Sequence, residues 1–210
     1  MSSLQLLQNL GLYIEPNFLS PEVCDRCFDE AQMATGKPAR VWEPDGKNNL
    51  DLVEDEIQRK TEQLQVSDGI YAEIENRLLS LKPSIEQKFD IELKACQNLL
   101  FYRYKEGSFF GVHRDSCDRP LAPEFLRQRR VSTIIFLNQR TEEPDVDSSL
   151  PSYCGGSLAF YGLIDNPHWQ NCGIPVPSQP GMLVAFRSDL LHEVKKVTAG
   201  IRYTIVSWFV

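Results

Sequence analysis

The sequence predicts a mainly β (α+β) fold, a barrel or a double-sheet jelly roll, with helices in the N-terminal part of the chain. Beyond residue 93, short runs rich in apolar, aromatic and β-branched residues are separated by glycine and proline, the pattern of short strands joined by turns. The first third instead shows apolar residues at helical spacing. No internal repeat or linker divides the 210 residues. We therefore expect one domain, in which residues 1–92 support a core formed by residues 93–210.

A short strand at residues 12–14 and a helix at residues 21–34 are the first elements that we expect. Ser20 and Pro21 form a helix start, with serine as the N-cap and proline in the first turn. Apolar residues then recur on one face of this helix, which we expect to be buried.

A second helix is expected at residues 68–81, because apolar residues recur every four positions from Ile70 to Leu78. Residues 83–89, which begin with a proline, are expected to add one or two further helical turns. Between the two helices, residues 37–49 contain proline and glycine and are expected to form turns and loops.

Six strands are expected in the second half of the chain. They are residues 99–104, 131–137, 157–161, 182–186, 192–197 and 201–209. Two long connections, residues 116–130 and 140–153, and an insertion at residues 163–174 interrupt them. Loops of this length in a compact domain are usually functional or disordered. We expect them, together with residues 59–61, to form the rim of a site.

The charge of the chain excludes some partners. It carries 22 Lys and Arg against 29 Asp and Glu, a net charge of -7. Because phosphate binding needs clustered positive charge, we expect no nucleic-acid partner. The one basic cluster, Arg127, Arg129 and Arg130, is interpreted as a solvated face or as neighbours in a loop. No stretch approaches the ~20 apolar residues that span a bilayer, and the N-terminus does not resemble a secretory signal, so we expect no membrane partner and a cytoplasmic location.

Six cysteines are scattered along the chain, and without an export signal we expect reduced thiols. Cys24 and Cys27 have the spacing of half a zinc site. No second such pair and no nearby histidine completes it. A buried helix face explains these two cysteines better than a metal or redox site does.

Two of the three histidines, His113 and His192, indicate a metal site. On an extended strand, residues i and i+2 point to the same side, so His113 and Asp115 can present an imidazole and a carboxylate to one point. His192 is far enough along the chain to come from a distant strand of the same barrel. Two imidazoles and one carboxylate form the facial triad of non-haem Fe(II) oxygenases, which leaves positions open for substrate and oxygen.

Arg202, ten residues beyond His192, extends this pattern. A 2-oxoacid can chelate Fe(II) through its carboxylate and keto oxygens, and its far carboxylate then needs a fixed cation. Arginine offers a rigid, two-pronged donor for that group. Taken singly, each residue is better explained as a core histidine, a strand end or a surface arginine. Their order, strand context and spacing together favour the iron site.

Several blocks of the sequence extend these motifs. They are residues 103–115 (RYKEGSFFGVHRD), 131–138 (VSTIIFLN), 155–161 (GGSLAFY), 180–186 (PGMLVAF), 192–194 (HEV) and 200–209 (GIRYTIVSWF). In this order they resemble the 2-oxoglutarate and Fe(II)-dependent dioxygenases of the prolyl 4-hydroxylase type. The resemblance spans residues 97–210, and residues 17–20 resemble the same family more loosely.

The resemblance implies a double-stranded β-helix, or jelly roll, flanked by N-terminal helices. It assigns Fe(II) to His113, Asp115 and His192. It assigns the distal carboxylate of 2-oxoglutarate to Arg202, with Tyr104 also reaching the co-substrate.

One residue departs from the family pattern. Many members carry tyrosine where this chain has Phe136, and the tyrosine hydroxyl helps to hold the 2-oxoglutarate carboxylate. Thr204 lies two residues beyond Arg202 on the same strand face and is an alternative donor, although core packing explains it equally well. Many relatives also carry lysine in place of Arg202.

The activity implied is hydroxylation of an unactivated C–H bond, coupled to decarboxylation of 2-oxoglutarate to succinate and CO2. Fe(II), 2-oxoglutarate and O2 are required, and ascorbate is a further candidate cofactor. Asp115 argues against halogenation, since a halogenating relative would need a small residue there to leave room for chloride.

The substrate is predicted by family analogy alone to be a prolyl residue in a peptide or protein. A free or carrier-bound amino acid is the alternative. Arg59, Arg119 and Arg127 could hold a substrate carboxylate or an acidic peptide, although solvated surface charge explains them slightly better. His168 and Trp169 are interpreted as a packed loop anchor.

Two hypotheses from other classes stay open. One is a non-catalytic jelly-roll binding module in which the triad is incidental. The other is a nucleic-acid demethylase on the same iron scaffold, which would be expected to show a basic groove and an additional arginine after Arg202. The sequence does not indicate an oligomeric state.

Overall fold

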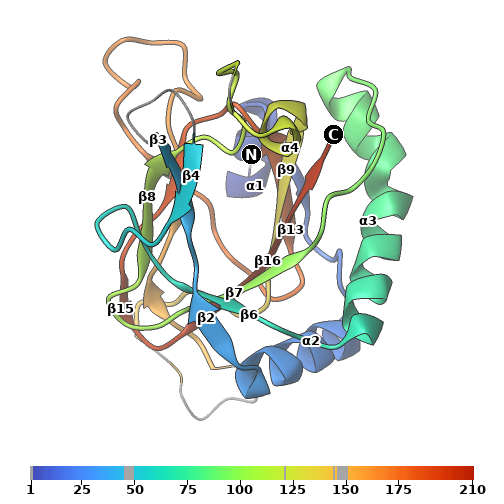
Figure 1. Cartoon of the computed structure of the whole chain (residues 1–210), viewed down its shortest axis with the longest axis vertical. Helices are drawn as coiled ribbons and strands as arrows, with labels where there is room; N and C mark the ends of the chain where they lie inside the picture. Colours follow the sequence, from blue (N-terminus) through green and yellow to red (C-terminus); the bar gives the residue numbers. More distant parts are fainter. Residues whose placement is uncertain (1, 45–49, 121, 144, 146–150) are drawn as a thin grey trace.

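Two antiparallel sheets face each other in the computed structural model, which describes residues 2–44, 50–120, 122–143, 145 and 151–210 (Figure 1). The larger sheet has the order β1-β13-β9-β16-β7-β6-β2. Its strands are β1 (Tyr13–Glu15), β13 (Leu183–Arg187), β9 (Val131–Phe136), β16 (Arg202–Phe209), β7 (Leu100–Tyr104), β6 (Glu62–Leu64) and β2 (Gly36–Pro38).

The smaller sheet has the order β12-β11-β14-β8-β5. Its strands are β12 (Ile174–Pro175), β11 (Leu158–Phe160), β14 (His192–Val194), β8 (Phe109–His113) and β5 (Arg59–Lys60). Two further pairs complete the β structure, β10 (Cys154–Gly155) with β15 (Val197–Ala199), and β3 (Val41–Pro44) with β4 (Leu50–Val53).

The alternation of side chains along the central strands explains the layers. Every residue of β9 is buried, because successive side chains point to opposite faces and both faces are covered. Ile134 and Phe136 belong to an apolar cluster with Leu158 of the smaller sheet. Ile135, on the opposite face, packs in the cluster that includes the helices. This is the mainly β jelly-roll core that the sequence predicts.

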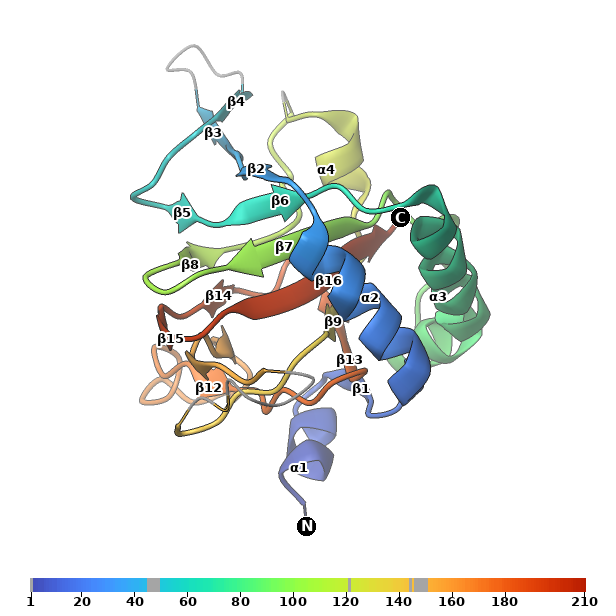
Figure 2. The ribbon, with the colours of Figure 1, turned by 90° about the horizontal axis from the view of Figure 1, so that it is seen from below.

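Helices α2 (Pro21–Met33) and α3 (Asp68–Phe89) lie together on the outer face of the larger sheet (Figure 2). As expected, α2 begins at Pro21 with Ser20 as N-cap, and Cys24 and Cys27 are buried on its inner face. A short helix α1 (Ser3–Asn9) precedes β1, and α4 (Glu124–Gln128) lies in the connection before β9; the sequence patterns indicated neither.

The second predicted helix proves longer and unbroken. It runs through Pro83 to Phe89 as one helix rather than as two segments. Proline removes one backbone donor and disfavours the helix. Two interactions oppose this effect: Ile85 is fully buried against the core, and Lys82 pairs with Glu86 at 2.8 Å across one turn.

The prediction of loops at residues 37–49 is wrong in part. The short strands β2 and β3 lie there, whereas residues 39–40 between them belong to no strand. Residues 45–49 of that prediction lie outside the described residues. The predicted strand 192–197 is interrupted, since β14 ends at Val194 and β15 begins at Val197.

No helix in the described part of the chain is both long enough and apolar enough to cross a lipid bilayer.

Candidate iron and co-substrate site

His113, Asp115 and His192 come together at one end of the smaller sheet. His113 ends β8 and His192 begins β14, and these two residues are paired across the strands. One ligand atom from each of the three side chains lies within 4.8 Å of the others. The structure thus brings together the three residues that the sequence singled out.

The expectation that Asp115 shares an extended strand with His113 is wrong in detail. β8 ends at His113, and Asp115 lies in a bend that follows. Backbone contacts hold this bend in place. The Asp115 amide donates to the Ser188 carbonyl at 2.9 Å, and Arg129 Nη1 donates to the Asp115 carbonyl at 3.2 Å.

The two imidazoles direct free nitrogen lone pairs at the same point. His113 Nδ1 lies 2.7 Å from the Gly111 carbonyl, and His192 Nδ1 lies 2.9 Å from the Leu190 carbonyl. A carbonyl only accepts, so each Nδ1 carries the proton and each Nε2 is left as a ligand atom. These Nε2 atoms lie 3.6 and 3.7 Å from the two oxygens of Asp115.

Burial and neighbouring charges set the protonation states of His192 and Asp115. Burial, together with the neighbouring His113, lowers the pKa of His192 to about 4, against the opposing effect of Asp115. Burial alone would raise the pKa of Asp115, but His192, His113 and Arg129 hold it well below its usual range. At neutral pH the cluster therefore presents a neutral His192 imidazole and one carboxylate, the protonation state that binds a metal.

Arg202 is a buried cation with unused donors. Arg202 is the first residue of β16 and is only 1 % exposed. Its guanidinium carbon lies 4.8 Å from the centre of the Tyr104 ring. Nη1 donates to the Thr204 hydroxyl at 3.4 Å, whereas Nε and Nη2 have no hydrogen-bond partner among the described residues. Burying unpaired donors of a cation is costly, so this arrangement fits an anionic ligand that supplies the missing acceptors.

Two neighbours shape the space around Arg202. Phe136 lies opposite Thr204 across β9 and β16, and the Arg202 guanidinium carbon lies 5.5 Å from the centre of its ring. Gly156 has φ of +57°, and a Cβ added there would lie 3.3 Å from Arg202 Cδ and 2.9 Å from Val197. The glycine therefore leaves room for the arginine side chain where a larger residue would not.

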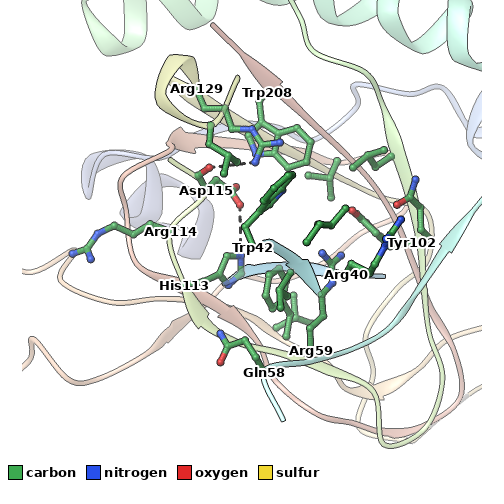
Figure 3. A pocket seen from close by; sticks show the side chains of 18 of the residues that line it. Arg40, Trp42, Gln58, Arg59, Tyr102, His113, Arg114, Asp115, Arg129 and Trp208 are labelled. Carbon is green, nitrogen blue, oxygen red and sulfur yellow. Dashed lines mark hydrogen bonds and ion pairs between the residues drawn. The ribbon is translucent and has the colours of Figure 1, made fainter. Parts of the chain in front are cut away.

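A cleft of about 1080 Å³ opens from the cluster toward the surface (Figure 3). His113, Asp115 and His192 line it together with Tyr104. So do residues that the sequence patterns did not indicate, among them Arg40, Trp42, Tyr102, Arg129 and Trp208.

Only part of the expected rim lines this cleft. The connection 116–130 contributes, with Arg119 among its residues, and so does Arg59. No described residue of 140–153 or 163–174 lines it, nor does Arg127. The loop-anchor interpretation of His168 and Trp169 is wrong, because both are exposed, Trp169 by 53 %.

The interpretation of Arg129 as solvated surface is also wrong. Its guanidinium carbon lies 3.5 Å from the centre of the Trp208 ring, and its Nε donates to Gln97 at 2.9 Å. Alternation along β16 could have indicated Trp208, since residues 202, 204, 206 and 208 share one face. No comparable pattern marks Arg129, which precedes β9.

Comparisons with known proteins agree with this geometry. The family model of the 2OG-Fe(II) oxygenase superfamily matches residues 99–210. PKHD-type hydroxylase tll1907 of Thermosynechococcus vestitus is 27 % identical over 84 % of this chain and 70 % of the relative. PKHD-type hydroxylase AM1_3707 of Acaryochloris marina is 30 % identical over 58 % of this chain, and the match spans about half of the relative, 45 %.

Solved structures share the fold. A prolyl-4-hydroxylase of Pseudomonas putida superposes with a TM-score of 0.64 at 20 % identity, over 95 % of this chain and 91 % of the other. A prolyl hydroxylase of Trichoplax adhaerens, in complex with a peptide fragment of the hypoxia inducible factor oxygen degradation domain, gives the same TM-score and identity. That match covers 100 % of this chain and 93 % of the other.

Proposed function

This chain belongs to the 2OG-Fe(II) oxygenase superfamily, an enzyme family that requires Fe(II), 2-oxoglutarate and O2, and from that premise we propose that it hydroxylates a prolyl residue in a peptide or protein. The observation that carries the proposal is the convergence of His113 Nε2, His192 Nε2 and the Asp115 carboxylate within 4.8 Å of one another, at the inner end of an open cleft.

We propose that His113, Asp115 and His192 hold the Fe(II). The donor set fits this ion, since two imidazole nitrogens and one carboxylate leave positions open on its far side. When bound, Fe(II) and 2-oxoglutarate supply the oxidising power that breaks an unactivated C–H bond, with succinate and CO2 as co-products. The protein itself fixes the ligands. Backbone carbonyls orient both imidazoles, and Ser188 and Arg129 hold the backbone of Asp115.

The distal carboxylate of 2-oxoglutarate is proposed to bind Arg202. The unpartnered Nε and Nη2 of this buried residue support the assignment, because a carboxylate accepts two parallel hydrogen bonds from one guanidinium edge. Thr204 orients the arginine through its hydroxyl, and Tyr104 covers the guanidinium with its ring. Phe136, which offers no hydroxyl, leaves this role to Thr204.

The size of the cleft and the names of the relatives support a peptide substrate. Its volume of about 1080 Å³ exceeds that of most small-molecule pockets. The exposed apolar side chains Trp42, Leu52, Val112 and Phe125 stand among its lining residues. A free or carrier-bound amino acid is the second candidate, because cationic side chains that could bind its carboxylate line the cleft. The use of ascorbate and a cytoplasmic location stay predictions.

Turnover of the Asp115→Ala variant tests the function. With Fe(II) and 2-oxoglutarate present, the wild-type protein should release succinate and add one oxygen atom to a proline-containing peptide, detected by mass spectrometry. Asp115→Ala should lose at least about 100-fold of this activity, because second-shell changes alone already cost 10- to 100-fold at metal sites. Its circular dichroism spectrum should match that of the wild type, since the ligand lies at an open cleft.

Asp118→Ala is the matched control, because this carboxylate is exposed three residues away and does not line the cleft. It should keep wild-type activity. Full activity in Asp115→Ala, or an equal loss in both variants, would contradict the ligand assignment. Succinate release without oxygen transfer to any peptide would contradict the peptide substrate.

A further inference from the structure

Among the charged side chains that line the cleft, cationic ones predominate, although the chain as a whole carries a net charge of -7. They are Lys37, Arg40, Arg59, Arg114, Arg119 and Arg129. Within the described part of the chain, Asp115 is the only carboxylate that lines this space, and the proposed iron would neutralise it. Such a charge distribution concentrates anions at the cleft.

Arg59 differs from the other five cations because it is buried, at 9 % exposure. It comes from β5, opposite Phe110 of β8. The guanidinium carbon lies 4.3 Å from the centre of the Tyr102 ring and 4.3 Å from that of Phe110. The two aromatic rings thus contact the guanidinium, and its Nε lacks a hydrogen-bond partner among the described residues.

The protein satisfies the Arg59 guanidinium only in part. The Tyr102 hydroxyl offers it one hydrogen-bond acceptor. Arg59 nevertheless forms no ion pair within 4.0 Å in the described residues, and its buried Nε has no hydrogen-bond partner there. A buried donor without an acceptor is destabilising, and a bound carboxylate would supply the missing acceptor and the opposite charge. Arg202, which does not line this cleft, also has unpartnered donors, and its proposed ligand is the co-substrate.

Arg59 also lies close to the proposed iron site. The Phe110 ring that contacts it is stacked on the His113 imidazole, with centroids 3.6 Å apart and planes tilted by 17°. One aromatic ring therefore contacts both the guanidinium and an iron ligand (Figure 3 shows Arg59 and His113 in the same cleft). A group bound to Arg59 would therefore lie in the same cleft as the proposed iron.

We propose that Arg59 binds a carboxylate of the substrate and selects for substrates that carry one near the hydroxylated carbon. This inference rests on the proposed function, and it names a substrate class for the same site. The carboxylate is either the α-carboxylate of a free amino acid or the side chain of an acidic residue beside the hydroxylated one. Arg40 and Arg119 also line the cleft but are exposed, and the proposal gives them no contact with the carboxylate.

Matched pairs of probes test the charge requirement. The iron-loaded enzyme with 2-oxoglutarate is given L-proline or L-prolinamide, and acetyl-Glu-Pro-amide or acetyl-Gln-Pro-amide. Succinate released above the level without probe is measured over a range of probe concentrations. In at least one pair the carboxylate member should have a kcat/KM at least about tenfold higher, since this corresponds to one charge-assisted hydrogen-bond pair. The pair that responds identifies the source of the carboxylate.

Substitution of Arg59 tests whether this residue causes the preference for carboxylate probes. In Arg59→Gln the carboxylate-to-amide ratio should fall toward one, mainly through a higher KM for the probe, and Arg59→Lys should restore part of it. The KM for 2-oxoglutarate should rise less than the KM for the probe, which separates Arg59 from Arg202. Arg119→Gln removes the same charge from an exposed position of the same cleft and should leave the ratio within about twofold of wild type.

Several results would overturn the inference. They are a preference for the amide members, no stimulation by any carboxylate probe, a ratio that survives Arg59→Gln, and stimulation by a methylated single-stranded oligonucleotide alone. Failure of the proposed function looks different. If the oxygenase activity fails, the wild type releases no succinate with or without any probe, and if only the peptide substrate is wrong, succinate release continues without oxygen transfer to a peptide. Failure of this inference alone leaves both succinate release and oxygen transfer to a peptide intact.

Discussion

At the residue scale, the hydroxyl of Thr204 has a defined role beside Arg202. Thr204→Val should raise the KM for 2-oxoglutarate about fivefold or more, because the hydrogen bond from Arg202 Nη1 is lost from a charged donor, at roughly 1 kcal/mol or more. Thr204→Ser keeps the hydroxyl and is the control. Steady-state kinetics with 2-oxoglutarate as the varied substrate measures both. An unchanged KM in Thr204→Val would mean that the residue only packs the core.

Alanine substitutions at two glycines distinguish the cost of crowding by neighbouring atoms from the cost of backbone strain. Gly156 and Gly162 both have positive φ, +57° and +73°, but a Cβ meets close neighbours only at Gly156. Gly162→Ala should lower the free energy of unfolding by about 1 kcal/mol, the cost of the left-handed conformation. Gly156→Ala should lower it by about 3 kcal/mol, since overpacking adds to that cost. Urea denaturation measures both, and equal losses would contradict the close packing around Arg202.

The cysteines of α2 should be unreactive. Burial raises the pKa of Cys24 to about 11 and, with Cys24 and Glu73 adding to the effect, that of Cys27 to about 12. At pH 8 both are therefore almost entirely thiols, and only the thiolate is nucleophilic. Iodoacetamide at pH 8 should modify the exposed Cys172 at least about tenfold faster, as followed by peptide mass spectrometry. Modification of all three at similar rates would revive the redox interpretation of this pair.

At the element scale, the hairpin of β3 and β4 reaches over the cleft toward α4. The Trp42 and Phe125 rings meet edge to face with centroids 5.6 Å apart, and both line the cleft. Trp42→Ala should raise the KM for a peptide substrate about threefold to tenfold, because such a pair contributes about 0.5–1.5 kcal/mol. The KM for 2-oxoglutarate should change less.

Trp169→Ala is the control for that variant, because Trp169 is an exposed tryptophan outside the cleft. It should leave both constants unchanged within about twofold. Equal effects of the two variants on the peptide KM would contradict a role for the hairpin in substrate binding.

The elements that the sequence predicted and those that it missed differ in a physical way. β9 and β16 are rich in apolar, aromatic and β-branched residues, so their composition indicates strands. β5, with the polar residues Arg59 and Lys60, is a strand only because it pairs with β8. In β2, Pro38 likewise argues for a turn when it is considered alone. Tertiary pairing overrides local preference at these edge strands, and they form one wall of the cleft.

The candidate site also contains residues that the sequence predicted and residues that it missed. The metal cluster was predictable because the chain has only three histidines, and His113 stands two residues from Asp115 with His192 far along the chain. Arg129 was not, because a basic cluster in the sequence gives no sign that one member stacks on Trp208. Its position depends on the bend that carries Asp115, which local propensity does not encode.

At the scale of the whole molecule, the acidic surface and the cationic cleft have opposite charge. The net charge of -7 disfavours nucleic acid, yet lysine and arginine predominate among the charged residues that line the cleft. The average charge of the chain therefore does not describe the site. That residues 1–92 support a core of residues 93–210 stays a prediction, and it is supported by the pairing of β1 with β13, β5 with β8 and β6 with β7.

Equilibrium binding of Fe(II) under anaerobic conditions tests the central claim most directly. The wild-type protein should bind one Fe(II) per chain, and 2-oxoglutarate should then produce a visible charge-transfer absorption band. His113→Ala, Asp115→Ala and His192→Ala should each weaken Fe(II) binding by at least about tenfold, and Arg202→Ala should retain the iron but weaken 2-oxoglutarate binding. No Fe(II) binding by the wild type, or undiminished binding in the three ligand variants, would contradict the account.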